Sequence, residues 1–312
     1  MTDPFKGLLI EKYRPKTLEE IVLTKEHREF FESLAATKDI PHLLFAGIQG
    51  TGKTSLAKII VNNILDCQYL YVNTSDGGGN IDSIRGNIAG FAKTKSFDGK
   101  IKVVLLDEVD SASLDGQRAL RGIIEDHAST CRFIMTCNYL FKVIAPIQSR
   151  CTIINLLPPV EFVVQRIVEI LKKEEVTIPQ EQKPLLLEHI RKNLPDLRRI
   201  INDIQKFSVT GTLNIRNDVS TEFAEGIFKD IRDKKDLMAI RKYVIENEKQ
   251  FSNDYRNLLK EVFEAIFVSD ISHDRKTNAL LSVSESMTND SFVVDKEINC
   301  FATLLKLSQI LN

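Results

Sequence analysis

Long hydrophobic runs are absent from this chain of 312 residues. Its longest apolar stretches, such as residues 103–106, are far shorter than the roughly 20 residues that a membrane-spanning helix requires. The amino-terminal residues also lack the basic and then apolar pattern of a secretory signal. We therefore expect a cytoplasmic protein with no membrane partner.

An excess of charge of one sign is absent as well, since 42 Lys and Arg residues face 43 Asp and Glu residues. The formal net charge of −1 excludes a generally basic protein, so any contact with nucleic acid requires positive charge arranged locally, on one face or in one channel. Cysteine is scarce, and the five cysteines form no Cys-x-x-Cys pair. A disulfide framework and a zinc ribbon are disfavoured, and we expect buried, reduced thiols.

The first half of the chain alternates short apolar runs with helical patterns. Apolar runs that predict strands span residues 42–47, 69–73, 101–107, 131–137 and 151–156. The third and fourth runs contain few polar residues, which is typical of strands buried on both faces of a parallel sheet. Helical patterns lie between the runs, at residues 53–64, 80–95 and 115–127. This alternation predicts an α/β domain with right-handed crossovers, which we place at residues 1–157.

After residue 157 the pattern becomes one of amphipathic helices. Helices are predicted at residues 161–173, 181–193, 196–207 and 218–228, and we assign residues 158–228 to a small helical domain. Residues 229–312 are again helical and form a third domain. In its final predicted helix, residues 293–311, the apolar stripe is read as Val294, Ile298, Phe301 and Leu305.

Residues 47–54 (GIQGTGKT) fit the P-loop pattern G-x-x-x-x-G-K-[ST], after a predicted strand and before a predicted helix. Glycines let the backbone N–H groups turn toward phosphate oxygens, and the helix N-terminus favours negative charge. Lys53 is predicted to reach the β- and γ-phosphates, and the Thr54 hydroxyl to bind Mg²⁺. The motif therefore predicts ATP and Mg²⁺ as cofactors, with a nucleotide cradle of Gly47, Gln49, Gly50, Thr51, Gly52, Lys53, Thr54 and Ser55.

Two acids and an amide follow the third and fourth predicted strands. Asp107 is predicted to hold Mg²⁺, and Glu108 to polarise the attacking water as a general base. An acid pair is what a hydrolysing site needs, rather than simple nucleotide storage. Asn138 can orient the water or contact the γ-phosphate without adding charge. The alternative is a purely structural role, since asparagine is also favoured in turns.

These residues together resemble the AAA+ ATPases and, within them, clamp-loader subunits of the replication factor C type. Residues 11–15 (EKYRP) match the signature that lines the adenine pocket of the family, which implies a nucleotide contact for Lys12, Tyr13 and Arg14. Residues 149–151 (SRC) match the motif whose arginine, here Arg150, acts as a finger on the nucleotide of the neighbouring subunit. Residues 195–198 (PDLR) resemble the lid motif whose arginine, here Arg198, contacts the γ-phosphate.

The length and the PDLR variant most resemble the large ATPase subunit of T-even-type phage clamp loaders. The resemblance implies an AAA+ P-loop domain with a five-stranded parallel sheet, a helical lid domain and a helical collar domain that supports oligomerisation. It implies four copies that join one small subunit, a sliding clamp and primer–template DNA, in the cytoplasm of a bacterial host cell. ATP binding would drive clamp opening and DNA binding, and hydrolysis would release the closed clamp on DNA during replication.

Such a loader contacts DNA mainly at the phosphates. The predicted helices that begin near residues 80 and 115 are the expected contact elements, and their candidate residues are Arg85, Gln117 and Arg118. Related sequences carry a basic residue just before residue 81. A basic residue there could couple contact with DNA to the catalytic acid Glu108. Residues 77–80 (GGGN) contain none, so any such coupling must come from elsewhere in the chain.

Two alternatives also stay open. One is another AAA+ DNA-associated machine, such as a helicase loader or a branch-migration motor, although residues 74–86 lack the aromatic residue with which many translocases grip their substrate. The other is a scaffold that does not hydrolyse ATP, against which Lys53 and Glu108 argue.

Overall fold

The computed structural model describes residues 7–37, 39–78, 80, 82, 84–96, 99–215, 219–251, 253–290 and 292–311. The chain divides into two compact units, residues 1–215 and residues 216–312. No helix within these described ranges is long and apolar enough to cross a membrane.

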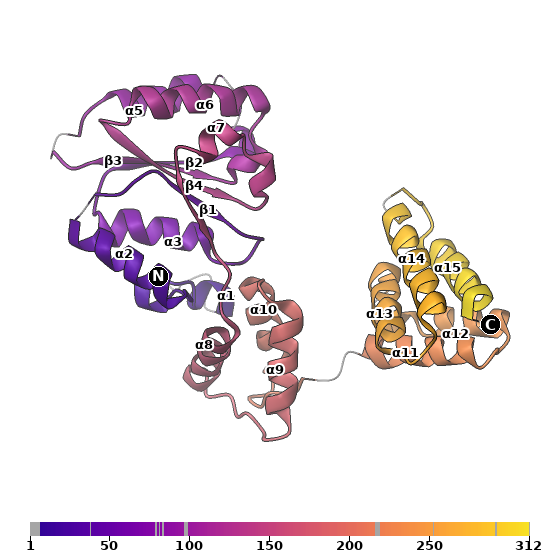
Figure 1. Cartoon of the computed structure of the whole chain (residues 1–312). Coiled ribbons are helices and arrows are strands. Elements are labelled where there is room, and N and C mark those ends of the chain that lie inside the picture. Colours follow the sequence, from indigo (N-terminus) through magenta and orange to yellow (C-terminus); the bar gives the residue numbers. More distant parts are fainter. Residues whose placement is uncertain are drawn as a thin grey trace. The chain divides into compact units, whose positions relative to one another are not determined.

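The first unit is built on a parallel sheet whose strand order is β2-β3-β4-β1-β5 (Figure 1). The described strands are β1 (Leu43–Ala46), β2 (Tyr69–Asn73), β3 (Lys102–Asp107), β4 (Cys131–Cys137) and β5 (Thr152–Asn155). Both β1 and β3 are buried along their whole length, which explains their continuous apolar sequence. The five-stranded parallel sheet predicted from the sequence is confirmed. Its order places the carboxyl ends of β1, β3 and β4 side by side.

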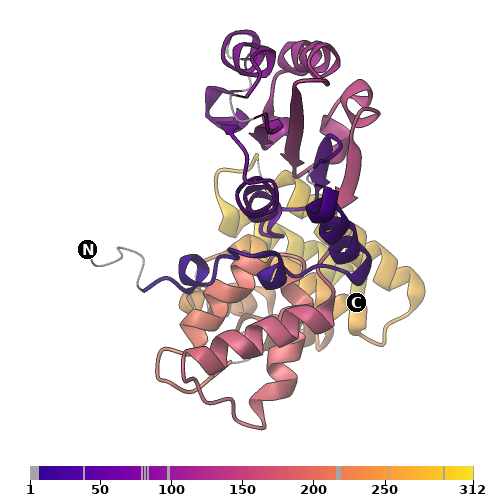
Figure 2. The same cartoon turned by 90° about the vertical axis from the view of Figure 1, so that its left-hand side faces the viewer.

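Helices cover both faces of this sheet, as Figures 1 and 2 show. On one face lie α2 (Lys25–Thr37) and α3 (Lys53–Ile59), which continues into the π-helical turn η2 (Ile60–Ile64). The other face carries α6 (Leu114–Asp126), α7 (Ala145–Gln148), and α5 (Ala89–Lys93) with its preceding turn η4 (Ile84–Ile88). Alternate residues of each strand enter the two cores, so that Leu43 and Phe45 pack on one side and Leu44 on the other.

The same unit contains a helical lid with a core of its own. The described lid helices are α8 (Val160–Lys173), α9 (Gln182–Asn193) and α10 (Leu197–Phe207), and the short α1 (Leu9–Lys12) packs against them. Leu9 and Ile167 belong to this core, together with Ile190 and Ile200. The amino-terminal signature is therefore joined to the lid through buried apolar contacts.

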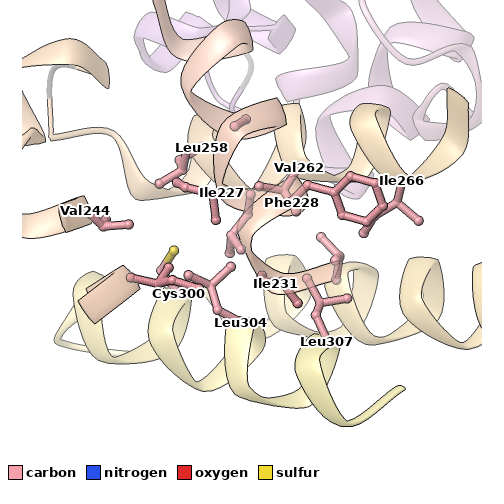
Figure 3. Packing of buried hydrophobic residues seen from close by; sticks show 14 of the residues in the cluster. Ile227, Phe228, Ile231, Val244, Leu258, Val262, Ile266, Cys300, Leu304 and Leu307 are labelled. Atoms are coloured by element: carbon pink, nitrogen blue, oxygen red, sulfur yellow. The ribbon is translucent and has the colours of Figure 1, made fainter. Parts of the chain in front are cut away.

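The second unit contains α11 (Val219–Arg232), α12 (Leu237–Glu246), α13 (Tyr255–Val268), α14 (His273–Asn289) and α15 (Lys296–Leu311). Figure 3 shows its core, to which α11 contributes Ile227, Phe228 and Ile231. The prediction that the helix at 218–228 closes the lid domain is wrong, because this helix buries its apolar face against α13 and α15. The boundary between the units falls at residue 215, not at residue 228.

The last helix also differs from its prediction. It begins at Lys296, because the Asp295 side chain accepts hydrogen bonds from the N–H groups of Glu297 and Ile298 at 3.0 and 3.2 Å. Val294 is fully exposed and Ile298 is 57% exposed, so the predicted stripe is not the buried one. The residues of α15 that enter the core are Cys300, Leu304, Leu307 and Leu311.

Leu258 of α13 is fully buried in the core of the second unit, so its truncation should lower the stability of that unit strongly. Replacing Leu258 by alanine leaves a cavity, so we expect the free energy of unfolding of the second unit to fall by about 2–5 kcal/mol. The matched change at Leu281, a residue of α14 that is 58% exposed, should alter it by less than about 0.5 kcal/mol. Denaturant unfolding followed by circular dichroism measures both, and equal effects would contradict the buried position of Leu258.

Candidate functional site

The predicted P-loop joins the end of β1 to the start of α3 and borders a cavity of about 550 Å³. Residues from Gln49 to Ser55 line this cavity, and so do side chains from the middle of β2, from the carboxyl ends of β3 and β4 and from the lid. Gly47 is not among the residues that line it, and its carbonyl accepts a hydrogen bond from Lys53. We call this space the P-loop cavity.

Lys53 opens α3 with its ammonium group turned into the loop. Its Nζ donates to the carbonyls of Gly47 and Ile48 at 2.7 and 2.8 Å, and to Asn138 Oδ1 at 2.9 Å. Burial lowers the pKa of Lys53, while nearby acids, including Asp107, act in the opposite direction. The ammonium is thus held by acceptors that phosphate oxygens can replace.

Asp107, at the end of β3, is buried beneath hydroxyl groups. Thr54 donates to its two oxygens at 2.9 and 3.0 Å, Tyr71 to Oδ2 at 3.0 Å, and Thr136 to Oδ1 at 2.5 Å. Burial and the neighbouring Asp107 raise the pKa of Tyr71 to about 12, so its phenol stays a donor.

The pairing of Thr54 with Asp107 fits a magnesium ion that is bound together with phosphates. Mg²⁺ prefers oxygen ligands, and beside a nucleotide it uses only one or two protein groups. Among the described residues, no group of three or more His, Cys, Asp or Glu side chains could hold a metal by itself. A hydroxyl and a carboxylate that meet in the P-loop cavity are therefore the donor set that suits a shared, phosphate-dependent ion.

Glu108 lies one residue beyond the strand, where the chain turns with a left-handed φ of 59°. Its backbone N–H donates to Thr136 Oγ1 at 3.0 Å, and its carbonyl accepts from Thr74 Oγ1 at 2.5 Å. The turn separates the two acids, so that Asp107 is buried while Glu108 is half-buried and lines the cavity. The two neighbouring acids therefore have different environments at the border of the cavity.

The amino-terminal signature contributes only part of the predicted set. Tyr13 and Arg14 line the cavity, whereas Lys12 does not, because its Nζ forms an ion pair with Glu174 at 2.6 Å. The Tyr13 hydroxyl donates to the same carboxylate, and burial together with Glu174 raises the pKa of Tyr13 to about 12. Lys12 thus joins the signature to the end of α8 and lies away from the nucleotide cradle.

The lid contributes Arg198, the arginine of the PDLR motif, to the lining of the cavity. The adjacent Arg199 is exposed and lies 3.9 Å from Asp203. A second lid arginine, Arg166 of α8, also lines the cavity, although the sequence did not predict it as a site residue. Tyr71 and Thr136 were not predicted either, although each lies within a predicted strand, at residues 69–73 and 131–137.

Gly50 brings the P-loop against the lid. Its φ is +83°, and a β-carbon added there would lie 1.9 Å from Oδ1 of Asp196, the residue that caps α10 by accepting the N–H of Arg199 at 3.0 Å. We expect Gly50→Ala to destabilise the nucleotide-free protein by more than the roughly 1–2 kcal/mol of left-handed strain alone. Gly52→Ala is the matched control, since its φ is +91° and its β-carbon would meet nothing within 4 Å. Denaturant unfolding compares them, and equal losses would contradict this close approach.

Arg150 lies outside the P-loop cavity of its own chain. Its guanidinium pairs with Glu125 of α6 and donates to the carbonyl of Pro146 at 2.6 Å. The side chain is one-third exposed, so it occupies the surface of the first unit.

The residues nominated for DNA contact have different environments. Arg85 is exposed on η4, and Arg118 is exposed on α6 with Asp115 at 3.0 Å. Gln117 is only 3% exposed, and its amide bonds to the backbone at Ala112, Lys142 and Ile144. The predicted DNA contact of Gln117 is wrong, because its polar atoms are buried and already hydrogen-bonded.

Comparison with known proteins gives relatives that match most of this chain. Residues 43–159 match the ATPase family associated with various cellular activities (AAA). A replication factor C small subunit of Saccharolobus solfataricus is 33% identical over 96% of this chain and 94% of its own length. A replication factor C small subunit of Sulfolobus acidocaldarius is 41% identical, over 67% of this chain and 65% of its own length. The sliding-clamp-loader large subunit of Escherichia phage RB69 is 36% identical, with 66% of each chain covered.

Solved structures resemble the fold as well. The RuvB Holliday junction branch migration motor of Thermotoga maritima has a TM-score of 0.52 and 19% identity, with 74% of this chain and 85% of that chain covered. At this identity the likeness shows the AAA+ fold alone. The long match to a replication factor C subunit shows more than the fold. This chain belongs to the AAA+ ATPases and, within them, to the clamp-loader ATPase subunits of the replication factor C type.

Proposed function

We propose that this chain binds ATP with Mg²⁺ in the P-loop cavity and hydrolyses it to drive the loading of a sliding clamp onto primer–template DNA. The observation that carries the proposal is the convergence of Lys53, Asp107, Glu108, Asn138 and Arg198 on one cavity from four separate segments of the chain. The relatives named as clamp-loader and replication factor C subunits support clamp loading as the purpose of this ATPase.

The binding roles follow from the contacts within the cavity. Phosphate oxygens would replace the loop carbonyls and Asn138 as acceptors for Lys53, and the guanidinium of Arg198 would neutralise charge from the lid side. Thr54 and Asp107 would hold Mg²⁺, which neutralises phosphate charge when it is bound. Tyr13 and Arg14 would lie beside the base.

The hydrolytic roles belong to the groups beyond β3 and β4. Glu108 is half-buried, lines the cavity and would accept the proton of the attacking water. The Asn138 amide is held beside Lys53 and would orient that water without adding negative charge. Lys53 would stabilise the charge that develops on the transferred phosphoryl group.

The position of Arg150 supports a role on a neighbouring subunit. An arginine finger supplied from another protein must project from the surface and not into its own cavity. The pair between Arg150 and Glu125 would have to open for the guanidinium to reach that nucleotide. We therefore infer an assembly of several copies, which we propose to be four, with one small subunit and a sliding clamp.

DNA binding would use exposed cations of the first unit, with Arg85 and Arg118 as the remaining candidates. Residues 79, 81 and 83 of the glycine-rich segment before Arg85 lie outside the described residues. Because the chain carries a net charge of −1, binding must depend on such local contacts to phosphates.

ATPase assays test the proposed function directly. With the small subunit present, we expect primed DNA and the clamp together to raise the ATPase rate, and native mass measurement to give a 4:1 complex. An ATPase rate that stays the same when primed DNA and the clamp are added together would overturn the clamp-loading proposal. The fold shared with a branch-migration motor makes that activity the second candidate, and movement of DNA branches without any clamp would favour it.

A further inference from the structure

Asp110 has a pattern of contacts that the functions described above do not use. It lies in the short turn η5 (Val109–Ser111), two residues after Glu108. Its carboxylate accepts the backbone N–H of Asn138 at 3.2 Å from each oxygen, and the N–H of Tyr139 at 3.0 Å on Oδ2. One half-buried side chain therefore bridges the turns that follow β3 and β4.

This bridge begins where the pairing of the two strands ends. The last residues paired between β3 and β4 are Leu106 and Met135, so the backbone ladder does not extend to Glu108 and Asn138. Side chains provide the connection instead. Thr136 forms the inner tie, through the N–H of Glu108 and the carboxylate of Asp107, and Asp110 forms the outer one.

The outer tie controls where the Asn138 amide points. A carboxylate that accepts two successive backbone N–H groups fixes both the position and the direction of that turn. The amide oxygen of Asn138 then meets Lys53 Nζ at 2.9 Å, inside the P-loop cavity. The same carboxylate belongs to the turn after β3, so this turn is the support against which Asn138 is held.

We propose that Asp110 is a positioning residue for hydrolysis, which anchors the Asn138 turn to the turn after β3 and thereby fixes the direction of the Asn138 amide. The inference rests on the proposed function of Glu108 and Asn138. Asp110 touches neither nucleotide nor water in this role. It acts through Asn138, and its loss lowers turnover without removing the groups that bind phosphate.

The test is Asp110→Asn in the full chain, with and without Asn138→Ala. Asparagine keeps the size but places an NH₂ group against one of the backbone donors. We expect kcat to fall by about 100-fold, as for a misplacement of about 1 Å, while ATP affinity measured with a fluorescent analogue changes by less than about threefold. Asp126→Asn is the matched control, since Asp126 is an exposed residue at the end of α6.

The double-mutant cycle separates positioning from general damage. If Asp110 acts through Asn138, then Asp110→Asn should lower kcat no further in the Asn138→Ala background. Losses that multiply, or an unchanged kcat in the single variant, would overturn the proposal. A loss of ATP affinity equal to the loss of kcat would also overturn it, since it would indicate a damaged binding site. If the wild-type chain has no ATPase activity at all, the proposed function itself is contradicted.

Discussion

Glu108→Gln is expected to lower kcat for ATP by about 100- to 10,000-fold while ATP still binds. Glutamine has the size and hydrogen-bonding reach of glutamate but cannot accept a proton from water. The neighbouring Asp107 keeps its bonds to Thr54 and Tyr71, so the phosphate and metal groups stay in place. Steady-state phosphate release measures kcat, and titration with a fluorescent ATP analogue measures affinity.

The control for Glu108 is Glu188→Gln, which makes the same chemical change at an exposed position of α9. It should leave both quantities unchanged. A Glu108→Gln protein that turns over at the wild-type rate would remove Glu108 from the mechanism. A protein that loses ATP binding in proportion to its rate would assign Glu108 to binding and not to proton transfer.

The second large effect is expected from Arg150→Ala, and only after assembly. A finger supplied by a neighbour is worth about 10³–10⁵ in rate, because it stabilises charge spread over the transferred phosphoryl group. Arg150 lies outside its own P-loop cavity, so we expect the assembled complex to lose that factor while the isolated chain keeps its basal rate. The matched control is Arg191→Ala, at an exposed position of α9.

A mixing experiment distinguishes action between subunits from action within one. Chains with Lys53→Ala and chains with Arg150→Ala are each expected to form inactive complexes. When the two are mixed, a site can combine an intact Lys53 from one chain with an intact Arg150 from the next, so part of the activity should return. Activity that stays absent in properly assembled mixtures would contradict the shared site.

Much of the candidate site could be predicted from sequence because its chemistry is carried by contiguous residues. The loop at residues 47–54 is defined by spacing alone, and Asp107 with Glu108 directly follows an apolar strand. Parallel strands end at one edge, so the structure brings these groups together with Asn138 as expected. The exceptions are residues whose role depends on a distant partner, such as Lys12, whose ammonium pairs with Glu174.

The sequence by itself determined the strands, the helices between the first four of them and the phosphate-binding loop, because apolar period and local spacing are properties of neighbouring residues. Only the tertiary structure decided which surfaces meet. It assigned α11 to the second unit, buried the Gln117 amide, and placed Asp110 against the backbone of Asn138. An amphipathic pattern indicates that one face of a helix is buried, but it does not identify the element that packs against that face. In the same way, the sequence around a polar side chain does not identify its distant hydrogen-bond donor. Those choices follow from the packing of elements that lie far apart in the chain.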